Sequence, residues 1–194
     1  MAATNSSNLD MVSGFAGSLQ LALLAGASDK SVAAIALHLC ELVEERYGLG
    51  VGDIAKQPGP NQLVGLSHGI TGALLVLDRT RRRAQKGCLD LDAEFVSRID
   101  ALIGSGLNWE YSVVSSHGNS WPDYRAEENF ADADAPGSMN AWCHGAFGAL
   151  VCWGEISSEG AAKSLNTEQV NELLTVARRS AREQIDQDFG NGFG

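Results

Sequence analysis

The residues best suited to chemistry stand together late in the chain, where a thiol directly precedes an imidazole. Segment 139–148 reads MNAWCHGAFG, so Cys143 and His144 come just before a Gly-x-x-Gly sequence. An apolar run, ALVCW, follows at 149–153. An imidazole can act as an acid or a base near neutral pH, and a thiolate can bind a metal ion. This segment is therefore the first candidate for a functional site.

The Gly-x-x-Gly sequence occurs twice more, each time ahead of an apolar run. Segment 65–72 reads GLSHGITG and leads into ALLVL, while segment 12–17 reads VSGFAG and leads into SLQLALL. With the glycines superposed, the residues before the first glycine are Ser13, His68 and His144. Glycine lets a backbone bend tightly or approach closely before a helix begins. Three copies of one unit therefore predict that these side chains meet at the N-terminal ends of equivalent helices.

Length and composition indicate a globular protein. The 194 residues, 44% of them hydrophobic, suffice for one domain with a substantial core. No apolar run approaches the ~20 residues of a membrane-spanning helix, and residues 1–8 lack the features of a signal peptide. The four cysteines are scattered, which favours reduced thiols and a cytoplasmic protein. The formal charge of −10 argues against nucleic acid as a partner, because phosphate binding requires a positive surface.

Helices must position the candidate residues, because no segment alternates polar and apolar residues for long. Apolar residues recur at helical spacing over 32–47, and Asp29 or Ser31 is expected to cap this helix. The second Gly-x-x-Gly unit is expected to lead into a helix over about 72–83. The fold class is therefore all-α.

The following part of the chain is expected to contain a helix and a long loop. Asp92 begins a helix that continues toward residues 109–111 and is weakened by Gly104 and Gly106. Residues 112–138 are then expected to form a polar loop, and a loop of that length within a compact domain usually has a function.

The alternation of short apolar helices with longer amphipathic ones predicts an α/α toroid. The last amphipathic helix begins at Asn166 or Thr167. The repeat units start near residues 9, 63 and 139, which gives about three helix pairs in one domain, residues 1–194. Three pairs are few for a closed ring, so we expect an incomplete toroid with exposed apolar edges and possible self-association.

One basic cluster follows the second apolar run, at Arg79, Arg81, Arg82, Arg83 and Lys86. Cations suit the negative C-terminal end of a helix, so a solvated helix end is the simpler interpretation. Binding of an acidic peptide or leader segment is the alternative.

Two motifs together resemble the cyclase domain of the lanthionine synthetase C family. They are GLSHGITG at 65–72, with His68, and AWCHGAFG at 141–148, with Cys143 and His144. The segments NSWPDYR at 119–125 and WEY at 109–111 are similar to the bifunctional, class II lanthipeptide synthetases in particular. Asp10, in LDMVSGFAG at 9–17, matches the family's first repeat. The resemblance covers essentially the whole chain.

The sequence departs from the family pattern in three ways. The family has a further Cys-His-Gly unit downstream, an N-terminal dehydratase region in class II members and, in some members, an arginine just before Trp-Cys. None of these occurs here, and Met139 and Asn140 occupy the segment where the arginine would be. The resemblance therefore implies a truncated cyclase domain that is expected to be inactive by itself.

The resemblance also implies a reaction and a cofactor. Cyclases of this family add a cysteine thiol of a precursor peptide across the double bond of a dehydroalanine or dehydrobutyrine, which closes a thioether ring. A free thiol is mostly protonated at neutral pH, with a pKa near ~8.5, and zinc binds the sulfur as a thiolate. Cys143 would be one zinc ligand. Because the Cys-His pair of the missing unit would supply the others, zinc binding by this chain is expected to be weak or absent.

Further roles follow from the same resemblance. His68 would be the acid or base that handles the proton at the enolate carbon, and His144 would orient the ligand or assist proton transfer. Asp10 would either hold the tautomer of an imidazole or cap a helix. Trp142 and Trp121 are assigned to the substrate pocket, and Trp121 also to holding the long loop together with Asp123 and Arg125.

Two other functions are compatible with the sequence. Toroids of this kind also occur in carbohydrate-active enzymes, which use carboxylates and apolar platforms; Asp10, Glu110 and Asp123 could supply the former, and Trp109, Trp121 and Trp142 the latter. A non-catalytic helical-repeat module that binds a peptide in its concave face is the second alternative. Metal analysis distinguishes these functions, because only the cyclase needs a thiolate site.

Overall fold

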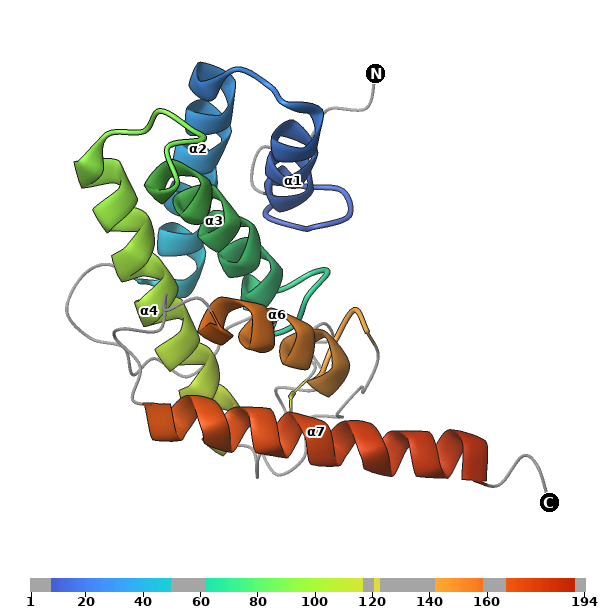
Figure 1. Ribbon diagram of the computed structural model, residues 1–194. Coiled ribbons are helices and arrows are strands. Elements are labelled where there is room, and N and C mark those ends of the chain that lie inside the picture. Colours follow the sequence, from blue (N-terminus) through green and yellow to red (C-terminus); the bar gives the residue numbers. More distant parts are fainter. Residues whose placement is uncertain (1–7, 50–61, 117–120, 123–141, 159–166, 191–194) are drawn as a thin grey trace.

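The computed structural model describes residues 8–49, 62–116, 121–122, 142–158 and 167–190, and the regular structure within these ranges is helical (Figure 1). The helices are α1 (Phe15–Ala25), α2 (Asp29–Tyr47), α3 (Ile70–Gln85), α4 (Ala93–Ser116), α6 (Ala146–Ser158) and α7 (Thr167–Gly190). The predicted all-α class is confirmed.

The helices pack in consecutive pairs. Helix α1 lies against α2, α3 against α4, and α6 against α7, while α3 also contacts both α1 and α6 (Figure 1). The first helices of the pairs thus form one layer, with α3 in its centre, and the second helices cover them. This arrangement is an arc of an α/α toroid with three helix pairs.

Burial follows the sequence pattern. In α3 all residues from 70 to 78 are buried, as expected for the central helix of the inner layer. Helix α2 buries one face, with residues three or four positions apart at Val32, Ala36, Leu39, Val43 and Tyr47. Its opposite face is polar and exposed, so α2 belongs to the outer layer.

The first turn of α2 differs from the predicted one. Neither Asp29 nor Ser31 caps the helix; Ser28 does, because its hydroxyl accepts a hydrogen bond from the backbone N–H of Ser31 at 3.2 Å. The predicted start of the next outer helix is confirmed within one residue: α4 begins at Ala93, and Asp92 Oδ1 accepts from the backbone N–H of Phe95 at 2.7 Å.

Helix α4 extends beyond its predicted end. The predicted start of the loop, at residue 112, is wrong, because α4 continues to Ser116 and buries Val113 and Val114. Helix α4 continues through Gly104 and Gly106, and a Cβ at Gly106 would meet Leu74 of α3 at 2.7 Å. Glycine thus lets the two helices approach closely. Residues 117–120 and 123–138 of the predicted loop, Asp123 and Arg125 among them, lie outside the described residues.

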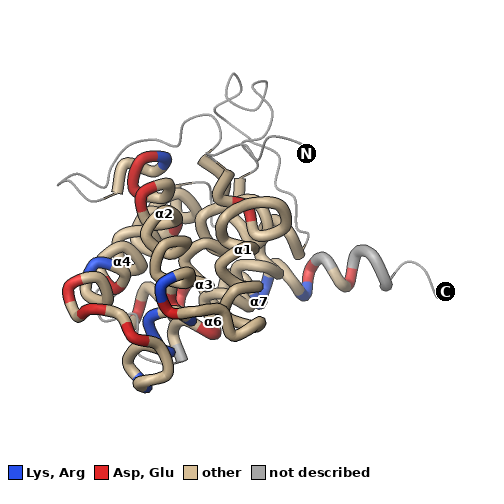
Figure 2. Tube along the Cα trace, turned by 90° about the horizontal axis from the view of Figure 1, so that it is seen from above, with Lys and Arg blue, Asp and Glu red and all other residues tan. Residues whose placement is uncertain are grey.

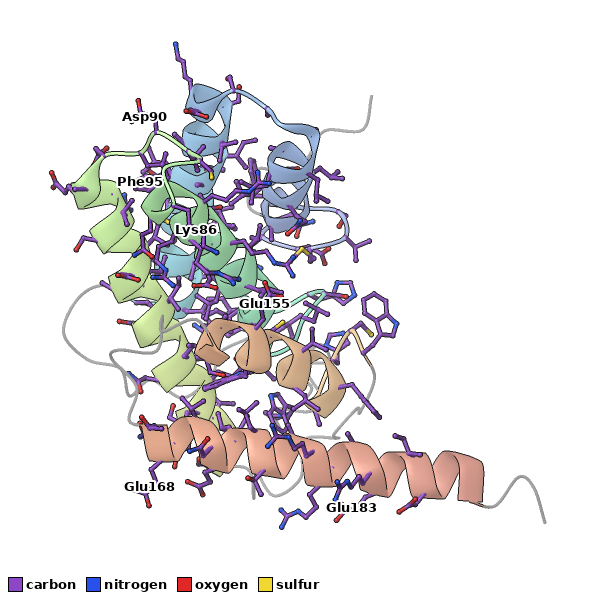
Figure 3. The ribbon with its side chains drawn as sticks, in the orientation of Figure 1. Lys86, Asp90, Phe95, Glu155, Glu168 and Glu183 are labelled. Atoms are coloured by element: carbon purple, nitrogen blue, oxygen red, sulfur yellow. The ribbon has the colours of Figure 1, made fainter. Side chains whose placement is uncertain are left out.

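The basic cluster of α3 is a solvated helix end only in part: Arg83 and Lys86 are exposed, whereas the other three members form ion pairs within the fold. Arg79 donates to both carboxylate oxygens of Glu155 on α6, at 2.8 and 2.7 Å, and Arg82 donates to the same group at 2.7 Å. Arg81 is buried and paired with Asp78 at 2.7 Å. Basic and acidic residues accordingly lie together beside α3 and α6 in Figure 2, and Figure 3 places Glu155 where α6 faces α3. The cluster holds inner helices together.

Candidate functional site

Three turns that are distant in sequence lie side by side at the N-terminal ends of the inner helices. The backbone N–H of Met11 donates to the carbonyl of Ser67 at 2.7 Å, and the N–H of Ser67 donates to the carbonyl of Cys143 at 3.1 Å. The turns before α1, α3 and α6 are thus joined in the order of the repeats. This is the meeting point that the superposed Gly-x-x-Gly units predict.

The repeated glycines have a shared structural cause. A Cβ on the second glycine of each unit would overlap the backbone carbonyl oxygen of the residue six positions earlier. The glycines concerned are Gly17, Gly72 and Gly148. Only glycine lets a turn fold back this closely on the helix that it precedes. The three Gly-x-x-Gly motifs therefore mark turns of the same conformation before α1, α3 and α6.

The two carboxylate oxygens of Asp10 bind groups in two different turns. Oδ1 accepts from the backbone N–H groups of Val12 and Ser13, at 2.6 and 2.8 Å, while Oδ2 is paired with Nδ1 of His68. Burial alone would raise the pKa of Asp10, but the hydrogen bonds from His68 and the two backbone N–H groups outweigh it and lower the pKa. Of the two roles predicted for Asp10, the imidazole contact is present, whereas the helix cap is not: the N-cap of α1 is Gly14, and Asp10 binds the turn before it.

His68 and His144 lie face to face. Their ring centroids are 5.1 Å apart and the rings are inclined by 29°. The side chain of His68 is 38% exposed, whereas His144 is only 4% exposed. Because an ionised carboxylate can only accept, Nδ1 of His68 carries the hydrogen of this pair, and Nε2 is the ring nitrogen that Asp10 does not bind. His68 is therefore the accessible imidazole of the pair.

Cys143 lies in the third turn, directly before His144, and is a partly exposed free thiol. Its carbonyl accepts from Ser67, the neighbour of His68. The structure therefore brings together Asp10, His68, Cys143 and His144, as the sequence predicts. Ser13 joins them through its backbone contact with Asp10.

The described residues alone do not complete a metal site. Across the described ranges, no group of three or more His, Cys, Asp or Glu side chains is placed to hold a metal ion. A zinc site requires at least three protein ligands. Cys143 thus remains a predicted ligand.

The two tryptophans assigned to the substrate pocket have different environments. Trp142 is 64% exposed and precedes Cys143, so it is accessible to a ligand. Trp121 is 2% exposed, and its indole N–H donates to Glu110 at 3.1 Å. This side chain belongs to the core.

A carbohydrate-active site receives no support from these positions. Glu110 is fully buried, as is Trp109, so neither can contact a sugar from its place in α4. Asp10 is engaged by His68 and by its own turn. Of the proposed platforms, Trp142 alone is exposed among the described residues.

The polar network around Glu110 is not predicted by the sequence pattern. Its carboxylate receives hydrogen bonds from Thr71, Trp121 and Trp153. A possible signal was present, since this acid interrupts the apolar residues of α4, with Leu107 one turn before it and Val113 and Val114 after it. Its partners come from other elements, so spacing within α4 could not identify them.

The four cysteines, all among the described residues, form no disulfide, and the length and hydrophobicity of the helices can be compared with those of a membrane span. Cys40 and Cys152 are buried, Cys88 is exposed, and all four thiols are free. Among the helices in the described ranges, none has the length and hydrophobicity to cross a bilayer.

The helix pairs and the joined turns define a protein class: an α/α-toroid protein with a Cys-His pair and an Asp-His pair at the N-terminal ends of its inner helices. The chain belongs to the lanthionine synthetase C-like family, because the family model described as "Lanthionine synthetase C-like protein" matches residues 2–190. Comparison with curated proteins and with solved structures finds no significant match.

Proposed function

We propose that this chain carries part of the site with which a lanthipeptide cyclase adds a cysteine thiol to a dehydroalanine or dehydrobutyrine of a precursor peptide. The observation that supports this most is the pairing of Asp10 with His68 beside the turn that carries Cys143. Membership of the lanthionine synthetase C-like family supports the same reaction class.

The addition requires proton transfer but no oxidant. The substrate thiol loses its proton, its sulfur bonds to the β-carbon, and the electron pair of the double bond moves toward the α-carbon, which then takes up a proton. His68 is proposed to donate or accept one of these protons through Nε2. Asp10 would hold the ring by Nδ1 and stabilise it when it is positively charged.

Zinc is proposed as the cofactor of the complete site, where it would supply the substrate sulfur as a thiolate at neutral pH. Cys143 is the residue of this chain proposed to hold it. The 194-residue chain is proposed to bind zinc weakly or not at all and to be inactive alone, because its sequence has one Cys-His pair, at 143–144, and the family resemblance implies ligands from a second. The proposed partner is a precursor peptide, and the proposed location is the cytoplasm.

Ring closure in a dehydrated, cysteine-containing peptide tests this function. Closure leaves the peptide mass unchanged but removes a thiol, so alkylation followed by mass spectrometry counts the rings. We expect the chain extended at its C-terminus by a Cys-His-Gly helical unit to close rings, and His68→Ala to slow closure by roughly 10²-fold or more. His38→Ala is the matched control, because His38 lies on α2 and makes an edge-to-face contact with Phe15. Peptide binding without any ring closure would favour the non-catalytic module.

A further inference from the structure

Glu110 is a buried acid that joins three parts of the fold. Its Oε1 accepts from Thr71 Oγ1 at 2.8 Å and from Trp121 Nε1 at 3.1 Å, and its Oε2 accepts from Trp153 Nε1 at 3.1 Å. The donors belong to α3, to the described segment 121–122 and to α6. A carboxyl group without solvent contact is costly unless its oxygens are paired, and here three donors satisfy it.

One path of contacts leads from Glu110 to the joined turns. The hydroxyl of Thr71 accepts from the backbone N–H of Gly65 at 3.0 Å while it donates to Glu110. Gly65 has a positive φ of 123°, and its backbone lies against the third turn: an added Cβ would be 3.0 Å from the carbonyl oxygen of Cys143 and 3.1 Å from Cα of His144. The Thr71 hydroxyl thus holds Gly65, and Gly65 is the point at which the turn of His68 contacts the turn of Cys143.

A second path leads through α6. Trp153 lies in this helix, and the turn before the helix carries Cys143 and His144. A single carboxylate therefore contacts two of the three inner helices whose N-terminal turns build the site, α3 and α6. Burial raises the pKa of Glu110 to about 7 against the opposing effect of its three donors, so the group is sensitive to loss of any of them.

We propose that Glu110 is a positioning residue for the candidate site: through Thr71 and Trp153 it sets the placement of His68 relative to Cys143 and His144, without contacting substrate. The consequence for catalysis rests on the proposed function. The coupling itself involves only this chain and can be measured without any reaction.

The test follows the histidine rings by NMR in the 194-residue chain labelled with ¹⁵N-histidine. Ring signals are assigned with His68→Gln and His144→Gln. We expect Glu110→Gln and Thr71→Val to move the signals of His68 and His144 but not that of His38. Thr71→Ser keeps the hydroxyl and should restore the original signals. This pair keeps the test decisive if Glu110→Gln does not fold.

Glu155→Gln is the matched control. Glu155 also joins α3 to α6, but its partners Arg79 and Arg82 lie in the second half of α3, whereas Thr71 lies in the first turn beside His68. This variant should lower the thermal stability without moving the ring signals of His68 and His144. If Glu110→Gln and Thr71→Val lower stability and leave both rings unchanged, Glu110 is only structural and the proposal is wrong.

Activity provides the second readout, in the extended chain. Glu110→Gln and Thr71→Val should lower kcat roughly 10- to 100-fold with little change in KM, because displacing a reacting group by about 1 Å can cost about 10²-fold. Absence of ring closure in the unmodified extended chain would contradict the proposed function while the coupling seen by NMR still stands. A KM effect with unchanged kcat would contradict the positioning role.

Discussion

Asp10 connects its own turn with the next repeat. Its role as an acceptor for Val12 and Ser13 follows from local sequence, because an aspartate readily accepts from backbone N–H groups two or three residues later. Its contact with His68, 58 residues away, depends on how α1 packs beside α3. The sequence identifies Asp10 as a candidate through its match to the family's first repeat, whereas its pairing with His68 is seen only in the folded chain.

Replacement of Asp10 by Asn tests the charged contact. Asn keeps an acceptor for the turn but loses the negative charge beside His68, so we expect a stability loss of roughly 1–3 kcal/mol at pH 7. The folded-state pKa of Asp10 lies below its ordinary value of 3.8. Its contribution is therefore complete above that value and is lost as the pH falls through the lowered pKa. Urea unfolding of both proteins at pH 7 and at about pH 3 measures this; an equal difference at both pH values would refute it.

Close packing of α3 on α4 shows where helix propensity misleads. Gly104 and Gly106 predict a weakened helix, yet α4 continues to Ser116. Tertiary contact decides the outcome, because Gly106 provides the space into which Leu74 fits. The sequence predicts that a helix is present here but not its end, since burial of Val113 and Val114 depends on neighbouring elements.

Two glycine-to-alanine changes separate propensity from packing. Gly106→Ala should destabilise the protein by roughly 1–3 kcal/mol, because its Cβ would lie 2.7 Å from one methyl carbon of Leu74 and 2.9 Å from the other. Gly154→Ala in α6 should instead stabilise by about 0.5–1 kcal/mol, because no atom lies within 4 Å of a Cβ there. Chemical denaturation compares the variants, and equal effects would contradict the packing argument.

The ion pairs of Glu155 between α3 and α6 are predicted to stabilise the fold in a pH-dependent way. Hydrogen bonds from Arg79, opposed by burial, lower the pKa of Glu155 to about 2. Its contribution to stability is present above its ordinary value of 4.5 and is lost as the pH falls toward 2. Glu155→Gln should cost roughly 2 kcal/mol at pH 7. Glu183→Gln is the control, because its ion pair with Arg179 on α7 is exposed and 4.0 Å long (Figure 3) and should contribute at most about 0.5 kcal/mol. Equal losses in the two variants would contradict this account.

The arc of three helix pairs follows directly from the repeated sequence. Superposition of the Gly-x-x-Gly units predicts that the three turns meet, and the backbone hydrogen bonds between them confirm it. The ion pairs of α3 and the network of Glu110 were beyond sequence reasoning, because each joins residues of different helices. Family membership agrees with the fold, since the family model spans residues 2–190.

The arc also predicts self-association. Leu21 and Leu24 on α1 are 67% and 71% exposed, and Val151 on α6 is 58% exposed. Apolar residues on the inner helices favour contact with a second copy. Sedimentation velocity should therefore show concentration-dependent association, and Leu21→Gln with Leu24→Gln should reduce it. A monomer at all concentrations would contradict the prediction.

Zinc binding distinguishes the cyclase from both alternative functions. The chain extended by a Cys-His-Gly unit should contain about one zinc per molecule, and Cys143→Ala should abolish this uptake because it removes one of three ligands. Cys88→Ala removes an exposed thiol elsewhere and should leave the zinc content unchanged. The 194-residue chain should give up any zinc to a chelator. If that chain instead retains one chelator-resistant zinc, or if Cys143→Ala leaves the uptake of the extended chain unchanged, the assignment of Cys143 to the site is wrong.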